Sequence, residues 1–129
     1  MTKEQLMLKV LNRKFPFIIE VIDKLSDNYC DIQLVVDYKK FKEYVKIDDK
    51  HLSSMDLIVG YYSKKNEYYS LMYLSSMLND NINRENEPFQ ILDNLQGEIV
   101  YLMERFYQSY LPESLKKHTH CYFNNFIFK

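Results

Sequence analysis

Residues 88–111, PFQILDNLQGEIVYLMERFYQSYL, carry the strongest structural pattern in the chain. Pro88 stands where the first turn of a helix tolerates proline, and Pro112 ends the pattern. Apolar side chains recur at spacings of three and four residues, at Leu92, Leu95, Ile99, Leu102, Phe106 and Tyr110. This periodicity predicts one long amphipathic helix. Its apolar surface is wider than a single seam, so we expect it to pack between two partners, one of which can belong to a second copy of the chain.

The N-terminal stretch contains two further helix signals. Thr2 and Gln5 have the spacing of a capping box, which predicts a helix over about residues 3–14 with an apolar stripe at Leu6 and Val10 that can extend to Phe15. Pro16 interrupts this helix, because proline is tolerated best in a first turn. A second helix is then expected from the apolar positions Ile18, Val21, Ile22 and Leu25.

Residues 30–47 fit either a strand or a helix. The β-branched run at 31–36 is typical of a strand, whereas Leu34, Tyr38, Phe41 and Val45 have helical spacing. The spacing favours a helix that follows a short extended piece. The aromatic tail at 121–128 is typical of an extended segment, and we expect it to dock on the domain or on a partner.

The middle of the chain is also ambiguous. Ser53 and Asp56 resemble a second capping box, which predicts a helix from about residue 54 through Tyr62, with a break near Gly60 or Ser63. The alternative for residues 57–62 is a strand. A further helix is expected over about residues 65–80.

These patterns favour an all-α fold, a compact bundle of five to seven helices around the long helix at about 88–111. The whole chain, residues 1–129, is expected to form a single helix-dominated domain. The alternative is an α+β fold with short strands near 31–36, 57–62 and 121–128.

The composition excludes several chemistries. The chain has two glycines, Gly60 and Gly97, and no alanine. Phosphate-binding loops need several glycines for close backbone approach, so P-loop NTPases and dinucleotide-binding oxidoreductases are excluded. A net charge of −1 lacks the basic excess of a nucleic-acid-binding protein. Abundant Lys, Asn, Ile and Tyr beside scarce Ala, Gly and Arg are typical of AT-rich coding, which favours a low-GC bacterium, a phage or another virus as the source.

The expected compartment is the cytoplasm. Cys30 and Cys121 can pair once but make no disulfide framework. Charged residues interrupt the first apolar stretch, and no stretch approaches the roughly 18 apolar residues of a membrane span. We therefore expect no contact with a membrane.

No catalytic residue, cofactor or metal is predicted. His118, His120 and Cys121 are metal-capable, but a structural zinc site usually has four ligands, and only Cys30 and His51 remain to complete it. A polar connector is the favoured interpretation, and metal binding stays open. Nothing local marks Cys30 and His51 as a nucleophile–base pair, and free cysteines are usually buried.

A lysine cluster is the basis of an alternative function. On one helix, Lys39, Lys42, Lys46 and Lys50 would share a face and could contact successive phosphates, as in a DNA-binding transcriptional regulator. Acidic residues are interspersed among these lysines, and the cluster contains no arginine, the residue that usually reads guanine. A solvated helix face is therefore favoured over nucleic-acid binding.

Tyrosines give the leading functional hypothesis. Five of them lie within thirteen residues, at Tyr61, Tyr62, Tyr68, Tyr69 and Tyr73, and one helix face cannot bury them all. Protein interfaces concentrate tyrosine because it offers large contact area with few torsions to freeze. The opposing interpretation is that each ring is buried and its hydroxyl reaches water.

The sequence thus favours a small non-enzymatic protein that acts through contacts with another protein, as an inhibitor, immunity factor or accessory factor. The candidate partner-binding residues are Tyr61, Tyr62, Tyr69, Tyr73, Tyr107, Phe126 and Phe128. A homodimer through the long helix or through the C-terminal aromatics is a further expectation.

Overall fold

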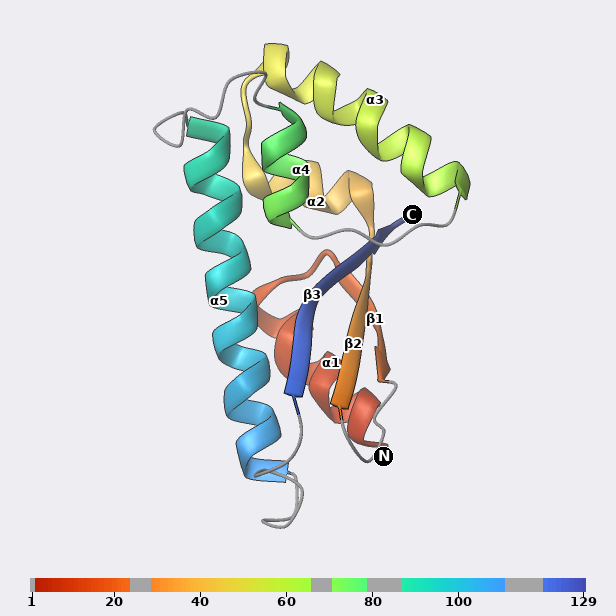
Figure 1. The fold of residues 1–129 in the computed structure, drawn as a ribbon, viewed down its shortest axis with the longest axis vertical. Coiled ribbons are helices and arrows are strands. Elements are labelled where there is room, and N and C mark those ends of the chain that lie inside the picture. Colours follow the sequence, from red (N-terminus) through yellow and green to blue (C-terminus); the bar gives the residue numbers. More distant parts are fainter. Residues whose placement is uncertain (1, 24–28, 66–70, 79–86, 111–119) are drawn as a thin grey trace.

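The computed structural model describes residues 2–23, 29–65, 71–78, 87–110 and 120–129 (Figure 1). In chain order these residues form α1 (Lys3–Lys14), β1 (Ile18–Asp23), β2 (Tyr29–Val36), α2 (Tyr38–Val45), α3 (Asp49–Lys65), α4 (Leu71–Leu78), α5 (Glu87–Tyr110) and β3 (His120–Phe128). The expectation of an all-α bundle is therefore wrong. The fold is α+β, mostly helical, with a three-stranded sheet.

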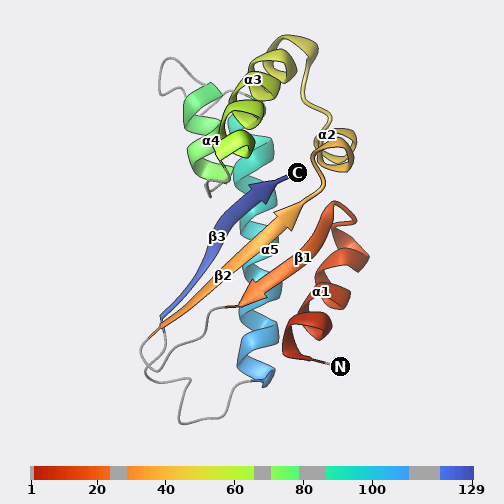
Figure 2. The same cartoon turned by 90° about the vertical axis from the view of Figure 1, so that its right-hand side faces the viewer.

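The sheet is covered by helices on one face and at one end (Figure 2). Its strand order is β1-β2-β3, with β1 antiparallel and β3 parallel to β2. α1 packs against β1, and α5 packs against both α1 and β3. α2, α3 and α4 lie beyond the end at which β2 and β3 finish (Figure 1). One hydrophobic core therefore runs from the sheet into this helical end.

Ile18, Val21 and Ile22, which were expected in a helix, lie in the strand β1, and Leu25, the last residue of that expected helix, lies outside the described residues. The register shifts between Ile18 and Glu20, so Ile19 is an extra residue in a β-bulge. Because of the bulge, Ile18 and Val21 both enter the core, although residues three apart in a regular strand face opposite sides. The three-residue spacing that resembled a helix thus comes from the irregular strand.

Residues 29–45 contain both elements that the sequence left open. β2 ends at Val36, and Asp37 then caps α2 by accepting a hydrogen bond from the backbone N–H of Lys40, at 3.2 Å. Residues 32–36 are buried, as expected for the central strand of a sheet. The strand near 31–36, which was the alternative, is therefore confirmed. A helix follows it as expected, but Leu34, which was expected in the helical stripe, lies in the strand.

The alternative strand at 57–62 is wrong, because these residues lie within the continuous helix α3. The break expected near Gly60 or Ser63 is wrong for the same reason. The proposed cap at Ser53 is wrong as well. Ser53 Oγ donates to the carbonyl oxygen of Asp49 inside the helix, at 3.1 Å. The helix begins at Asp49, five residues before the expected start near residue 54, and Asp48 precedes it.

The two helices with the clearest local signals are confirmed. Thr2 and Gln5 form a capping box, with backbone-to-side-chain distances of 2.8 and 3.1 Å. α5 spans 24 residues and buries Leu92, Leu95, Ile99 and Met103. None of the helices in the described part of the chain combines the length and apolar character that crossing a membrane requires.

The C-terminal strand β3 closes the core. The backbone of Lys129 exchanges hydrogen bonds with Val36 and Tyr38, at 2.8 and 2.9 Å. The Phe128 ring meets the Phe41 ring at 5.0 Å between centroids and the Tyr38 ring at 5.7 Å. The tail is extended, as expected, and it docks on its own domain.

Candidate functional site

The candidate site is the exposed face of α3, and its geometry begins at the helix start. Asp48 Oδ1 accepts a hydrogen bond from the backbone N–H of His51, at 2.9 Å, and the carboxylate also contacts His51 Nδ1 at 2.9 Å. The backbone hydrogen bond, with the imidazole contact second, holds the pKa of Asp48 below its ordinary value. Asp48 therefore caps α3, and the His51 ring contacts the capping carboxylate.

α3 has one buried side and one apolar ridge that points away from the protein. Met55 and Val59 are buried in the core. Leu57 is 78% exposed and Tyr61, one turn later, is 55% exposed. We call Leu57 and Tyr61 the α3 ridge. A leucine this exposed beside an exposed tyrosine indicates a contact surface more strongly than scattered single apolar residues do.

The residues that surround the α3 ridge are either basic or small. At 100° per residue, the same solvent-facing half of the helix contains the exposed residues Lys50, Ser53, Ser54, Gly60, Lys64 and Lys65. Lys65 Nζ lies 4.2 Å from the centroid of the Tyr61 ring and donates a hydrogen bond to its hydroxyl. Gly60 has no heavy atom within 4 Å of where a Cβ would stand. A partner can therefore approach the α3 backbone closely there.

Asp56 lies at the side of α3, and its carboxylate has partners within the same chain. It accepts a hydrogen bond from the Tyr38 hydroxyl, and Lys42 Nζ lies 3.4 Å from its Oδ1. These contacts join α2 to α3 and leave the neighbourhood of the ridge cationic.

α3 is also attached to the sheet. Ser63 Oγ donates to the carbonyl oxygen of Phe128, at 2.9 Å. Phe128 is buried in the core, so this contact connects the last turns of α3 to the core. The helix that carries the ridge is therefore attached to the C-terminal strand β3.

The tyrosines proposed from the sequence fall into three groups. Tyr61 is exposed, and Tyr62 is half-buried, packing on the core with its ring 5.2 Å from that of Tyr61. Tyr73 lies on α4 and Tyr107 on α5, and only their backbone positions are described. Tyr69 lies outside the described residues.

Phe126 and Phe128 do not form part of an exposed surface, which corrects the expectation for them. Their exposed fractions are 1% and 2%. Both belong to the hydrophobic core beneath the sheet. The C-terminal aromatic side chains that are described therefore stabilise the fold and are not available to a partner.

The lysine ridge expected across residues 39–50 does not form on one helix. Lys39 and Lys42 lie on α2, but Lys46 ends that helix in the left-handed conformation (φ 50°), and Lys50 belongs to α3. Lys42 is paired with Asp56 and lies 4.8 Å from the centroid of the Tyr38 ring. The division of the lysines between two helices removes the geometric basis for contacting successive phosphates.

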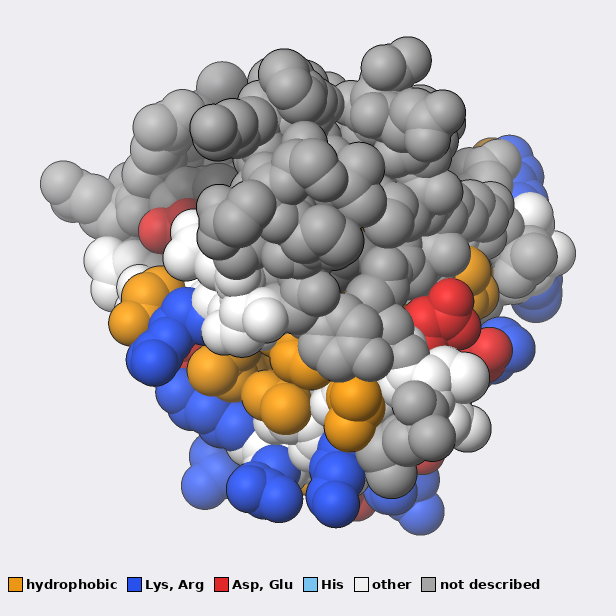
Figure 3. All heavy atoms as spheres, turned by 90° about the horizontal axis from the view of Figure 1, so that it is seen from below, with side chains coloured by type: hydrophobic (Ala, Val, Ile, Leu, Met, Phe, Trp, Pro, Cys, Tyr) orange, Lys and Arg blue, Asp and Glu red, His pale blue; other side chains and the backbone are white. Residues whose placement is uncertain are grey.

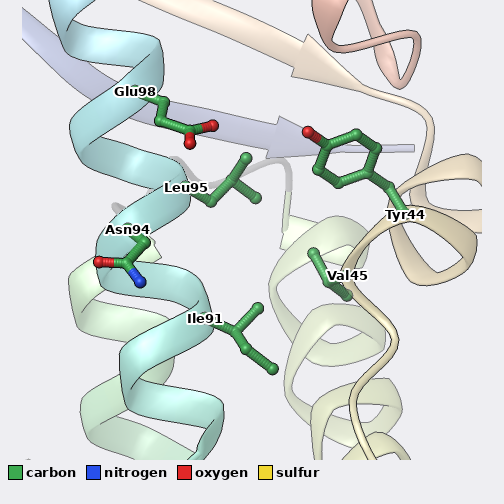
Figure 4. A pocket seen from close by; sticks show the side chains of 6 residues that line it. All are labelled: Tyr44, Val45, Ile91, Asn94, Leu95 and Glu98. Atoms are coloured by element: carbon green, nitrogen blue, oxygen red, sulfur yellow. The ribbon is translucent and has the colours of Figure 1, made fainter.

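A hollow of about 200 Å³ lies between α2 and α5 (Figure 4). Typical ligand pockets have volumes of about 300–1,000 Å³. Tyr44 from α2 and Glu98 from α5 both face it, and they are the ionisable side chains among its described lining. Glu98 is half exposed and lies 3.9 Å from Lys14 Nζ. These groups do not combine a nucleophile with a base.

A second hollow lies between α1 and β1, and its lining includes Leu8, Lys9, Asn12 and Ile19. Asn12 is occupied there, since its amide donates to the carbonyl oxygens of Pro16 and Ile18 at 3.2 and 2.8 Å. The end of the molecule opposite α3 shows a few apolar side chains bordered by Lys and Arg in its described part (Figure 3). The most exposed of the described apolar residues remains Leu57.

The other catalytic and metal candidates do not come together as a site. The start of β2, where Cys30 lies, and α3, which carries His51, are at opposite ends of the molecule (Figure 1). His118 lies outside the described residues, while His120 and Cys121 begin β3. Within the residues whose side chains are described, no three His, Cys, Asp or Glu residues gather as metal ligands.

Leu57 was missed by reasoning from tyrosines alone. A signal was present: on a helix, Leu57 lies about 160° from Met55 and opposite Val59, two apolar residues on the other side. An apolar residue opposite the apolar stripe is what the helical period identifies as exposed. The helical period could not be applied with certainty to Leu57 while a strand remained the alternative for residues 57–62, and the structure removes that alternative.

The chain matches no protein-family model, and comparisons with curated proteins and with solved structures find no significant similarity.

Proposed function

We propose that this chain is a small non-enzymatic protein that acts by binding another protein through the exposed face of α3. The observation that carries the proposal is the α3 ridge, with Leu57 78% and Tyr61 55% exposed one helical turn apart. Burying these two side chains against a partner would remove their apolar surface from water, which is the main favourable term in protein association.

The residues around the α3 ridge favour a partner that binds through a helical or loop segment containing acidic residues. Lys50 lies toward one end of the exposed face, and Lys64 and Lys65 lie toward the other. Opposite charges at the rim of an interface accelerate association and set the register, while the central apolar contact supplies most of the affinity. Gly60 gives the partner room beside Tyr61.

The test compares two tyrosines that are closely matched in environment. Tyr61 on α3 and Tyr101 on α5 are 55% and 58% exposed. Each has a cation four residues later, since Lys65 and Arg105 lie 4.2 and 5.6 Å from the respective ring centroids. Wild type, Leu57→Glu, Tyr61→Ala and Tyr101→Ala are used as bait in extracts of the native host, and captured proteins are identified by mass spectrometry.

We expect a specific protein to be retained by wild type and Tyr101→Ala and lost with Leu57→Glu. Tyr61→Ala should weaken binding of the purified partner at least tenfold in calorimetry, as buried interface tyrosines commonly do. Equal retention by wild type and the α3 variants, all with wild-type circular dichroism, would contradict the proposal. Equal loss with Tyr101→Ala would show that the binding surface is not specific to α3.

A further inference from the structure

The two cysteines of the chain are brought together by the sheet. The chain has two cysteines, Cys30 and Cys121, separated by most of its length. Cys30 lies in β2 and Cys121 in β3, and they are register partners in the parallel pairing of these strands. The pairs on either side, Tyr29 with His120 and Asp31 with Tyr122, are in the same register. The juxtaposition therefore belongs to a run of three aligned pairs.

The backbone spacing of this pair suits a covalent link. Neighbouring strands in a sheet lie about 4.7–4.9 Å apart. Disulfides join residues whose Cα atoms are about 4.4–6.8 Å apart. Register partners also occupy the same face of the sheet, because side chains alternate along both strands with the same period. Two cysteines at one register position thus lie at a Cα separation that a disulfide can span.

We propose that Cys30 and Cys121 form a redox-dependent intrachain disulfide that fastens the C-terminal strand β3 to β2. The oxidant is a small disulfide such as oxidised glutathione. One cysteine thiolate attacks it, forming a mixed disulfide and releasing one glutathione thiolate. The second cysteine thiolate then attacks the protein sulfur of the mixed disulfide and releases the other glutathione. Two protons leave the protein thiols, and two electrons reduce the oxidant to two glutathione molecules.

The link would act on the part of the fold that supports the helical end. β3 places Phe126 and Phe128 in the core, and the Phe128 carbonyl oxygen accepts the hydrogen bond from Ser63 of α3. A bond between residues 30 and 121 closes most of the chain into a loop, which restricts the unfolded ensemble. The oxidised protein should therefore unfold at a higher temperature than the reduced protein. In a reducing cytosol the bond would open again.

The experiment uses the full chain, reduced and then incubated with oxidised glutathione. Trypsin cleavage after Lys24, Lys39 and Lys117 releases the peptides 25–39 and 118–129, each with one cysteine. We expect mass spectrometry to find these two peptides joined and the intact protein to remain monomeric on a non-reducing gel. Cys30→Ser and Cys121→Ser are the matched controls. Each should stop at the mixed disulfide and gain the mass of one glutathione, because no second thiol is present to displace it.

Two outcomes would overturn the inference. The first is that the wild-type protein accumulates two glutathione adducts or disulfide-linked dimers, and the joined peptides are not found. The other is a bond that forms as fast in guanidinium-unfolded protein as in folded protein, since the sheet would then contribute nothing to bringing the thiols together. Both readouts use the wild-type chain, so they remain decisive if a serine variant fails to fold. Neither depends on the α3 ridge.

Discussion

Gly60 and Gly97 lie inside helices, on exposed positions, in a chain that contains no other glycine. Neither has a positive φ, and neither has a heavy atom within 4 Å of the position that a Cβ would occupy. Glycine inside a helix costs stability because the unfolded chain has more conformational freedom to lose. Within the isolated protein, nothing in their surroundings requires a glycine at either position.

We therefore predict that Gly60→Ala and Gly97→Ala each raise the free energy of unfolding by about 0.5–1 kcal/mol. Urea unfolding followed by circular dichroism measures this change. Binding distinguishes the two variants, because only Gly60 borders the α3 ridge. Gly60→Ala should weaken binding of the partner while it stabilises the fold, and Gly97→Ala should leave binding unchanged. A Gly60→Ala protein that is stabilised and binds normally would show that no partner approaches the backbone there.

Single residues of α1 also show where sequence patterns mislead. Leu6 and Val10 were expected to form the apolar stripe of α1, but Met7 and Leu11 are the buried residues and Val10 is 42% exposed. Both pairs have helical spacing, so periodicity locates the helix without choosing its buried face. That choice is made by β1 and α5, which pack against α1 from distant parts of the chain.

At the scale of elements, the residues at the start of α3 lead to a prediction about how stability depends on pH. The pKa of Asp48 is lowered in the folded protein, chiefly by the backbone N–H of His51. A carboxyl whose folded pKa lies below its unfolded value stabilises the fold fully above the unfolded value, about 3.9. This contribution is lost as the pH falls through the lower, folded pKa. Wild type should therefore lose more stability between neutral and strongly acidic pH than Asp48→Asn does.

Asparagine is the matched control because it caps a helix about as well as aspartate but does not titrate in this range. Asp48→Ala should be less stable than both at neutral pH, since it removes the acceptor for His51 N–H. Thermal unfolding at a series of pH values gives the comparison. Parallel pH profiles for wild type and Asp48→Asn would mean that the cap does not act through its charge.

Elements with local signals were predictable, and elements defined by distant contacts were not. The capping box of α1 and the periodicity of α5 involve residues within a few positions of one another. β1 carries a bulge whose spacing imitates a helix, and only its pairing with β2 reveals the strand. The site shows the same division: Tyr61 was identified from its residue type, whereas the exposure of Leu57 depends on where α3 begins and what it packs against.

At the scale of the whole molecule, the last residues of the chain decide whether the sheet and the helical end form one unit. β3 is parallel to β2, so it can pair only after the chain has passed through the helices between them. No local pattern contains that information. It explains why Phe126 and Phe128, which the sequence offered as partner-binding residues, are core residues.

Phe128 is the residue at which these parts meet, and its substitution tests whether they unfold together. Its ring contacts Tyr38 and Phe41, and its carbonyl oxygen accepts from Ser63 of α3. Phe128→Ala should lower the free energy of unfolding by about 3–5 kcal/mol, because it leaves a cavity at the junction. Phe128→Leu, the control, keeps an apolar side chain there and should cost clearly less. Circular dichroism and hydrogen exchange in α3 should change at the same denaturant concentration if the core is shared. If α3 kept its protection from exchange in Phe128→Ala while the sheet lost it, the helical end would have to be an independent folding unit with its own stabilising contacts.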